Sequence, residues 1–374
     1  MPKNIMQASK AKKSILLFSP RLDFGGSELT IISLSNGLVE REIDVTLLVL
    51  SVNSQVVNYL DSRVTLVDLK KPRLLRAVRA FFSFLTKNRG FDVYFSSMTY
   101  ANIYFFFLVK LSKPRAFVAL RLANSFVFEG LNGGVSRLEY LFAPFVYRRA
   151  NLVIVPIKEM IQETISAFKL TTTPLAIPNP CQLKYRPPTS SIELHENFAA
   201  ALDNGPVFLS VGRLEAQKDF VTLLRAFNLT RSRVTNSTLW IIGEGSQLNE
   251  LKKLRKELNL ESEVFFLGHC DNPTAYMNKS TIFVSASKFE AAANALSEAL
   301  ASYCRVVSTN APYGASELLQ NGRFGRLVNV GDVRALAEAM LASIKDKVDL
   351  EDRRIMLLER TLDGFVDRFE DALF

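Results

Sequence analysis

Two glutamates in the last third of the sequence could hold one ligand between them. Glu290 and Glu298 stand on either side of the run AAANALS, which predicts the start of a helix. Eight residues make just over two helical turns, so both carboxylates could reach neighbouring parts of one molecule. One could contact a sugar while the other accepts hydrogen bonds from ribose hydroxyls, and the helix N-terminal amides of Asn294 and Ala295 would point at a diphosphate. The alternative is an alanine-rich helix with solvated glutamates.

Two cations stand at a second position that could bind a phosphate. Arg213 and Lys218 lie five positions apart in a loop that follows the predicted strand Val207–Val211. A nucleoside diphosphate develops negative charge when it leaves a sugar, and a fixed Arg and Lys would stabilise that charge without a metal. The alternative interpretation is an exposed loop with stray surface cations.

A glycine turn follows the first predicted strand. Gly25 and Gly26 precede Ser27 and Glu28 there. Glycines permit tight turning and close backbone approach, and free amides at the start of the next helix can hold a phosphate. The spacing is not G-x-G-x-x-G, so a dinucleotide-binding dehydrogenase is not supported.

Short apolar runs alternate with amphipathic stretches along the whole sequence, which predicts an α/β protein with parallel sheets covered on both faces. The expected strands are Ser14–Ser19, Val45–Leu50, Val64–Leu69, Asp92–Ser96, Phe117–Leu120, Leu152–Val155, Val207–Val211, Thr238–Ile242, Val264–Leu267, Ile282–Ser285 and Arg305–Ser308. The expected helices are Glu28–Glu40, Leu74–Leu85, Ala101–Val109, Phe220–Phe227, Gln247–Leu258, Asn294–Ala301, Val333–Ala342 and one or two over Arg354–Phe374.

Proline-rich segments interrupt this alternation near the middle of the chain. The segment TTTPLAIPNP covers residues 171–180, and a Pro/Ser stretch follows at 187–191. A chain of 374 residues is also longer than one hydrophobic core usually accommodates. We therefore expect two domains with a boundary near residues 180–200.

The positive charge of the sequence lies wholly in its first half. Residues 1–180 hold 23 Lys and Arg against 12 Asp and Glu, a net charge of +11, whereas residues 181–374 carry −2. Arg73, Arg76 and Arg79 share one face of the predicted helix Leu74–Leu85. This asymmetry favours an anionic membrane surface or a phosphate-bearing acceptor, and not a nucleic acid, as the partner. A solvated basic face is the alternative.

Neither the apolar segments nor the cysteines point to a membrane span or a metal. No stretch reaches about 18 uncharged apolar residues, so no spanning helix is expected. The basic N-terminus lacks the long apolar segment of a signal peptide. Cys181, Cys270 and Cys304 are far apart, which favours plain buried thiols in a reducing compartment.

Several motifs occur in an order that resembles the retaining glycosyltransferases of the GT-B fold, in family four. They are GGSE after the first strand, the dipeptide Asn179-Pro180, SVGRLEAQKD, IIGEGSQ, VFFLGH, SKFEAAANALSEALA and GRLVNVGD. Within this family the sequence looks most like bacterial enzymes that build surface polysaccharides or lipid-linked oligosaccharides. The resemblance implies two Rossmann-like domains with parallel sheets facing a central cleft. Residues 1–180 would form the acceptor domain, completed by a C-terminal helix at 355–374, and residues 181–354 the donor domain.

The resemblance also implies roles for individual residues. Arg213 and Lys218 match the cations on the donor diphosphate, Glu290 the glutamate beside the transferred sugar, and Glu298 the glutamate on the ribose. Gly26, next to Gly25, matches the glycine whose backbone approaches the donor phosphate. The anomeric configuration would be retained, with neither cofactor nor metal, in agreement with the absence of any D-x-D motif.

The sequence departs from the family at two places. The family has a glycine directly after the first glutamate, then an aromatic residue and a Pro or Gly, where this chain has Ala291, Ala292 and Ala293. Alanine resists positive φ, so donor binding could be weakened, and replacing Ala291 by Gly should improve it. Where many members have an acceptor-side histidine, this chain has Arg121 and Asn124, which could contact donor or acceptor instead. We expect neither His195 nor His269 to be catalytic.

The sequence thus predicts an enzyme that moves a hexose or N-acetylhexosamine from a UDP-sugar to a glycan acceptor during cell-surface polysaccharide or oligosaccharide synthesis. The resemblance implies that this acceptor is lipid-linked. It would work in the cytoplasm, peripherally bound to the inner membrane face. The alternative is a nucleotide-sugar binding protein that kept the GT-B fold but lost turnover through the three alanines.

Overall fold

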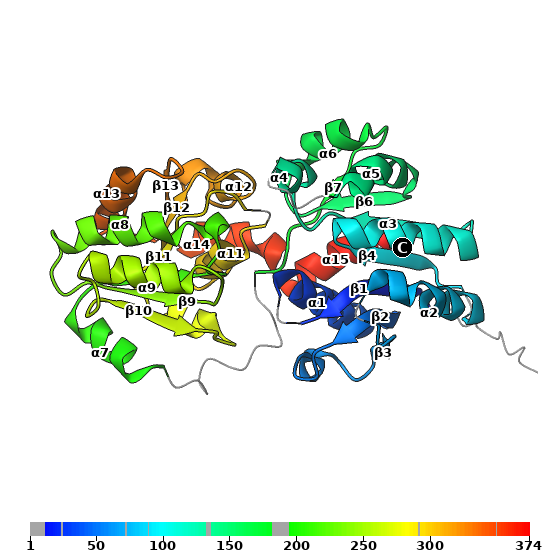
Figure 1. Ribbon diagram of the computed structural model, residues 1–374, viewed down its shortest axis with the longest axis horizontal. Helices are drawn as coiled ribbons and strands as arrows, with labels where there is room; N and C mark the ends of the chain where they lie inside the picture. Colours follow the sequence, from blue (N-terminus) through cyan, green and yellow to red (C-terminus); the bar gives the residue numbers. More distant parts are fainter. Residues whose placement is uncertain are drawn as a thin grey trace, which may run out of the picture.

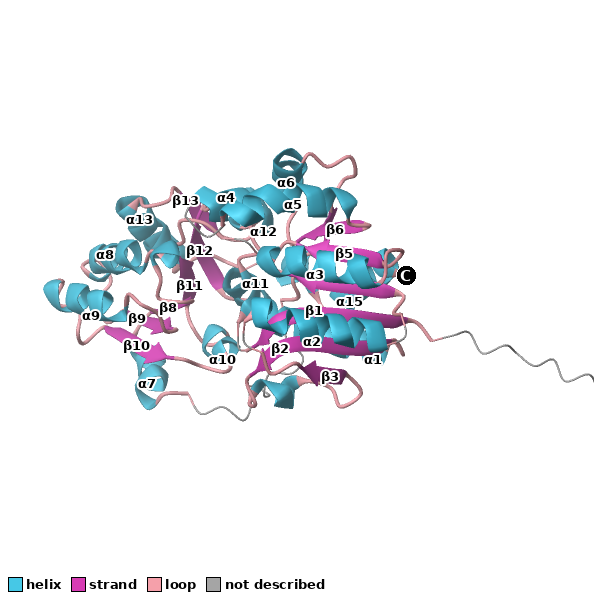
Figure 2. Ribbon diagram, turned by 45° about the vertical axis from the view of Figure 1, so that its right-hand side comes forward, coloured by secondary structure: helices cyan, strands magenta, loops and turns pink. Residues whose placement is uncertain are grey.

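The chain folds around two parallel β-sheets, each flanked by helices (Figures 1 and 2). The computed structural model describes residues 12–374 except 24, 72, 89, 132–135, 182–193, 291 and 349. One sheet has the strand order β3-β2-β1-β4-β5-β6-β7, and the other has the order β10-β9-β8-β11-β12-β13. This is the α/β architecture that the sequence predicts.

The strands of the first sheet are β1 (Ser14–Leu22), β2 (Asp44–Val52), β3 (Thr65–Asp68), β4 (Val93–Ser97), β5 (Phe117–Arg121), β6 (Leu152–Val155) and β7 (Leu175–Ala176). The strands of the second sheet are β8 (Val207–Val211), β9 (Thr238–Ile242), β10 (Val264–Gly268), β11 (Ile282–Ser285), β12 (Arg305–Thr309) and β13 (Arg326–Val328).

The helices up to the start of the second sheet are α1 (Gly26–Glu40), α2 (Leu74–Lys87), α3 (Thr99–Ser112), α4 (Phe126–Leu131), α5 (Arg137–Arg149), α6 (Met160–Phe168) and α7 (Glu196–Asn204). Those that follow are α8 (Phe220–Arg231), α9 (Leu248–Glu257), α10 (Pro273–Met277), α11 (Asn294–Ala301), α12 (Ala315–Leu318), α13 (Val333–Ser343), α14 (Leu350–Leu357) and α15 (Leu362–Leu373). Short 3-10 turns are η1 (Val56–Tyr59), η3 (Ala216–Lys218), η4 (Gln320–Gly322) and η5 (Leu358–Arg360).

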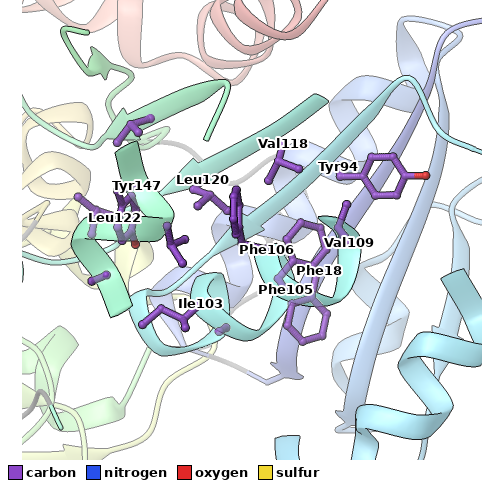
Figure 3. Packing of buried hydrophobic residues seen from close by; sticks show 14 of the residues in the cluster. Phe18, Tyr94, Ile103, Phe105, Phe106, Val109, Val118, Leu120, Leu122 and Tyr147 are labelled. Atoms are coloured by element: carbon purple, nitrogen blue, oxygen red, sulfur yellow. The ribbon is translucent and has the colours of Figure 1, made fainter. Parts of the chain in front are cut away.

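Each sheet is buried on both faces because its strands are apolar at consecutive positions. In β1, Leu16 and Phe18 point into the core under α2, α3 and α5, while Ile15 and Leu17 point into the core under α1. Figure 3 shows the first of these cores, in which the rings of Phe18 and Phe105 stack with their centroids 5.5 Å apart. The second sheet divides its side chains between two cores in the same way.

The C-terminal helix crosses back to the first domain. Phe365, Val366 and Phe369 of α15 belong to the core under α1, and Figure 1 shows α15 beside α1. Helix α14 packs differently, because Leu357 joins a core of the second domain. The segment that returns is therefore residues 362–373, which is shorter than the expected 355–374.

The two connections between the domains lie next to each other. The Cys181 amide donates to the Arg360 carbonyl over 2.8 Å, which joins the outgoing chain to the returning chain. The expected boundary near residues 180–200 falls between β7 and α7, and the Pro/Ser stretch at 187–191 lies outside the described residues.

Sequence patterns missed several short elements, namely α4, α5, α6, α7, α10, α12, β7 and β13. A recognisable signal existed for α5, because Ser136 and Glu139 form a reciprocal capping box at its start. In the described part of the chain, the helices all fall short of the length and apolar character that crossing a membrane requires.

Candidate active site

A cavity of about 770 Å³ lies between the two domains, where the carboxyl ends of both sheets meet. Parallel sheets bind ligands at this edge, because the loops and the helix N-termini that follow the strands gather there. All ten residues that the sequence singles out line this one cavity. They are Gly25, Gly26, Arg121, Asn124, Arg213, Lys218, Glu290, Asn294, Ala295 and Glu298.

Lys218 and Glu290 form an ion pair in the wall of the cavity. Lys218 Nζ lies 2.6 Å from Glu290 Oε1, and the two side chains are 19% and 10% exposed. They meet because β8 and β11, the strands that precede them, are neighbours in the sheet. An ion pair in the cavity wall keeps both charges fixed, so neither group must reorganise when a ligand arrives.

Ser287, an uncharged residue that the sequence does not single out, also binds the glutamate of this pair. Ser287 Oγ donates to the same Glu290 Oε1 over 2.5 Å. The carbonyl of Ser287 in turn accepts a hydrogen bond of 2.6 Å from Thr309 Oγ1, at the end of β12. Two donors on one oxygen fix the carboxylate and leave Oε2 for a ligand hydroxyl group.

Gln217 links the cation loop to the glutamate loop. The side-chain amide of Gln217 donates to the Phe289 backbone carbonyl over 3.0 Å. The backbone carbonyl of Gln217 accepts a hydrogen bond of 2.8 Å from the Lys288 backbone amide. Arg213 lies beside it, with Nη2 3.5 Å from Gln217 Oε1, and is exposed to the cavity. The loop therefore presents an accessible guanidinium group next to a fixed ammonium group.

The N-terminus of α11 reaches across to the first domain. Asn294 Oδ1 accepts a hydrogen bond of 2.9 Å from Asn179 Nδ2. A Cβ atom on Gly26 would lie 2.9 Å from Asn294 Nδ2, which is closer than ordinary contact allows. Glycine at position 26 therefore leaves room for the Asn294 side chain against the start of α1. The sequence alone does not give this structural reason for the glycine.

Ala293, the last of the three alanines, adopts a backbone conformation that alanine disfavours. Ala293 caps α11 with φ of 43° and ψ of 48°, in the left-handed region. Ala292 and Ala293 are both buried, and Ala291 lies outside the described residues. Alanine therefore takes a positive φ here at a cost of about 1–2 kcal/mol.

Arg121 is buried in the cavity wall and is only 2% exposed. It donates through Nη2 to Asn179 Oδ1, and burial lowers its pKa to about 10. The guanidinium group therefore stays positive at neutral pH and holds Asn179 toward Asn294. Asn124, by contrast, is an exposed lining residue of the cavity.

The remaining titratable groups near the cavity differ in their surroundings. Burial is the largest cause that raises the pKa of Glu28, which lines the cavity from α1. His269 also lines the cavity, and its Nε2 lies 3.0 Å from Asp271 Oδ1. His195 instead caps α7, where its Nδ1 accepts from the Asn197 amide over 3.3 Å.

A family model matches the part of the chain that forms the second-domain side of the cavity. Residues 192–356 match the family model described as glycosyl transferases group 1. This part of the chain is therefore similar to the group 1 glycosyl transferases. The matched residues contain Arg213, Lys218, Glu290 and Glu298, and thus the second-domain half of the cavity.

Two of the curated proteins to which the chain is similar are bacterial enzymes of glycan synthesis. One is the N-acetylgalactosamine-N,N'-diacetylbacillosaminyl-diphospho-undecaprenol 4-alpha-N-acetylgalactosaminyltransferase of Campylobacter jejuni, 34% identical over 54% of this chain and 53% of the relative. Another is the lipopolysaccharide core biosynthesis glycosyltransferase LpsE of Rhizobium meliloti, 30% identical over 44% of this chain and 46% of the relative. The chain thus spans about half the length of each of these two relatives.

Solved structures establish the fold over nearly the whole chain. HepE of Anabaena, in complex with UDP and glucose, is 18% identical with a TM-score of 0.76, and the match covers 96% of this chain and 99% of HepE. The galactosyltransferase WaaB of the lipopolysaccharide outer core is 17% identical with a TM-score of 0.71, over 97% of this chain and 99% of WaaB. The predicted GT-B fold is confirmed.

Proposed function

We propose that this protein is a retaining glycosyltransferase that moves a hexose or N-acetylhexosamine from a UDP-sugar to a lipid-linked glycan acceptor during surface-polysaccharide or oligosaccharide synthesis. The observation that carries the proposal is the fixed Lys218–Glu290 pair with Arg213 beside it, in a cavity that both domains line.

The residues would divide the work of the reaction between them. Arg213 and Lys218 would bind the diphosphate and neutralise the charge that develops as the glycosidic bond breaks, so no metal and no other cofactor would be required. Glu290 would accept hydrogen bonds from the transferred sugar, and Glu298 from the ribose. The amides of Asn294 and Ala295 at the start of α11, together with the Gly25–Gly26 turn, would face the phosphates.

The partners are inferred from the relatives. HepE was solved with UDP and glucose, which supports a UDP-sugar donor. The Campylobacter relative and an Escherichia coli galactosyltransferase, 27% identical over 46% of this chain and 45% of the relative, carry a diphospho-undecaprenol acceptor in their names. These names support an acceptor in which a glycan is attached to a lipid through phosphate.

The first domain would rest on an anionic membrane surface on the cytoplasmic side. Arg73, Arg76 and Arg79 are exposed on α2, and exposed Leu75 lies among them. Basic side chains with apolar neighbours favour the interface of anionic bilayers. Co-sedimentation with anionic and with neutral vesicles tests this, and equal binding to both would remove the electrostatic contribution.

A thermal-shift screen against UDP-, GDP- and ADP-sugars tests the donor assignment. A ligand that binds the folded state raises its apparent stability, so UDP-sugars should raise Tm most. The shift should shrink in Lys218→Met and should persist in EDTA. A larger shift with GDP- or ADP-sugars would contradict the UDP assignment, and loss of the shift in EDTA would contradict metal independence.

A catalytically impaired nucleotide-sugar binding protein is the second candidate. The strained φ of Ala293 next to the donor site is the observation that favours it. Donor hydrolysis or transfer separates the two candidates: binding of UDP with neither reaction would support the binding protein.

A further inference from the structure

The first domain contains a second cavity of about 790 Å³, which is distinct from the cleft between the domains. Helices α2, α3 and α5 form its walls. This volume falls in the range of ~300–1,000 Å³ that is typical of small-molecule pockets. None of the residues with a proposed role in donor binding lines it.

Apolar side chains dominate the lining of this cavity. Ile103, Phe107 and Leu108 come from α3, Val78 comes from α2, and Phe142 comes from α5. The ring of Phe107 contacts that of Phe142 with centroids 5.8 Å apart. Two further lining residues, Leu75 and Leu138, are 74% and 63% exposed. Such apolar exposure around a hollow indicates a ligand that removes this surface from water.

Charge at the rim favours an anionic head on that ligand. Arg73 and Arg76 line the cavity at the start of α2, and both are exposed. One acidic residue, Glu139, also lines the cavity, and its Oε2 accepts a hydrogen bond of 2.6 Å from the Ser136 amide at the start of α5. An amphiphile with a hydrocarbon chain and a phosphate matches this combination.

The first turns of α2 and α3, at the edge of the first sheet that also borders the cleft, line part of the apolar cavity. Helices α1, α2 and α3 begin where β1, β3 and β4 end, so their first turns gather at that edge. Tyr100, in the first turn of α3, lines the apolar cavity. Burial raises the pKa of Tyr100, and the charges of Glu28, which lines the cleft, and Glu139, which lines the apolar cavity, raise it further. Tyr100 thus lies near residues of both hollows.

We propose that this apolar cavity binds the hydrocarbon chain of the lipid-linked acceptor, with the phosphate near Arg73 and Arg76 and the glycan directed past Tyr100 into the cleft. This inference takes the lipid-linked nature of the acceptor from the proposed function and therefore rests on it. It adds that one lipid chain leaves the bilayer and enters the protein, which simple contact between α2 and a membrane surface would not require.

Binding of dodecyl phosphate, below its micelle concentration and without vesicles, tests the proposal by calorimetry on the full chain. We expect one saturable site. Val78→Trp, which fills the cavity, and Leu138→Glu, which places a charge in its wall, should each weaken binding by about tenfold or more.

Leu141→Glu is the matched control. Leu141 is 68% exposed and stands on the same helix as Leu138, but it does not line the cavity. Its variant should bind dodecyl phosphate as the wild type does. Equal weakening in Leu138→Glu and Leu141→Glu would overturn the proposal in favour of a membrane-facing surface. Concentration-dependent dimers that compete with the probe would overturn it in favour of a second copy of the chain.

A UDP thermal shift on the same variants keeps the two proposals apart. Unchanged UDP shifts in Val78→Trp and Leu138→Glu show that the fold and the donor site are intact, so a loss of probe binding belongs to the cavity. Absence of a UDP shift in the wild type would count against the proposed function, whereas absence of saturable dodecyl phosphate binding would count against the cavity.

Discussion

At the scale of single residues, the cleft is built from side chains that hold one another in place. Glu290 Oε1 accepts hydrogen bonds from both Lys218 and Ser287. On the opposite wall, Arg121 holds Asn179, which holds Asn294. Side chains fixed before the ligand arrives lose little entropy on binding, and their charges need no reorganisation during reaction.

Glu290→Gln should reduce transfer by roughly 10²–10³-fold, because it removes a fixed charge next to the reacting sugar. The fold should stay intact, since the amide has the same shape. Ser287→Ala is the graded control: it removes one of the two donors and should cost about tenfold or less. The measurements are the release of the nucleotide and Tm, and wild-type activity in Glu290→Gln would refute the site assignment.

Glu28→Gln should stabilise the fold at neutral pH. Burial raises the pKa of Glu28, so the folded state holds its proton more tightly than the unfolded chain does. Stability therefore falls as pH rises from the unfolded pKa, about 4.3, through the folded one, and the full penalty remains at pH 7. Tm of the variant and the wild type should differ at pH 7 and converge below about pH 4. Glu261→Gln, at an exposed site before β10, is the control for charge alone.

Charged residues and glycines at the ends of strands could be placed in this site from the sequence, whereas the uncharged partners could not. Arg213, Lys218 and Glu290 stand out because their ordered motifs resemble a family and because their charges suggest chemistry. Ser287 and Gln217 are ordinary residues in the sequence, and only the approach of β8 to β11 makes them partners of the ion pair. Asn179 stands in one of the ordered motifs, the dipeptide Asn179-Pro180, but its hydrogen bonds to Arg121 and Asn294 depend on how the two domains meet.

At the scale of elements, the strands other than the short β7 and β13 are predictable, and the helices α4, α5 and α6 of the first domain are not. Strands buried on both faces appear as continuous apolar runs, a pattern that survives any tertiary arrangement. The sequence of α5 lacks a clear amphipathic pattern, because the helix contains Pro144 and exposes Leu138 and Leu141. Leu138 lines the apolar cavity, whereas Leu141 does not, so an element that the sequence pattern does not predict contributes to the proposed lipid site.

The start of α11 offers a test at this scale. Ala293→Val should destabilise the protein by about 1–2 kcal/mol or more, because a β-branched side chain fits φ of 43° poorly and the site is only 4% exposed. It should also shrink the UDP thermal shift, since the amides of α11 face the cleft. Ala293→Gly, which tolerates this φ, is the control and should keep the shift. Equal effects of Val and Gly would contradict backbone strain as the cause.

At the scale of the whole molecule, the helix α15 ties the end of the second domain to the first. Gly37 of α1 lies where α15 crosses it, and a Cβ atom there would come within 2.2 Å of Val366 Cγ2. The amphipathic pattern of residues 354–374 predicted a helix, but neither the crossing point nor the separate packing of α14 could be derived from it.

Gly37→Ala should cost about 1–3 kcal/mol of unfolding free energy, because the added methyl group forces α15 away from α1. The same change in a Val366→Ala background should cost less, since the smaller side chain leaves room for it. Chemical denaturation of the wild type, both single variants and the double variant gives the coupling energy. Strict additivity would show that α15 does not constrain position 37.

The return of α15 also sets the order in which the chain can become folded during synthesis. Residues 362–373 leave the ribosome only after the entire second sheet has been made, yet they cover Ile15 and Leu17 of the first. Part of the first domain's core therefore stays exposed to water until α15 has been made, whereas the second domain can complete its fold earlier. Domains made early usually fold early. In this protein, the half that is synthesised first is completed last, and during that interval its uncovered face is a natural substrate for chaperones.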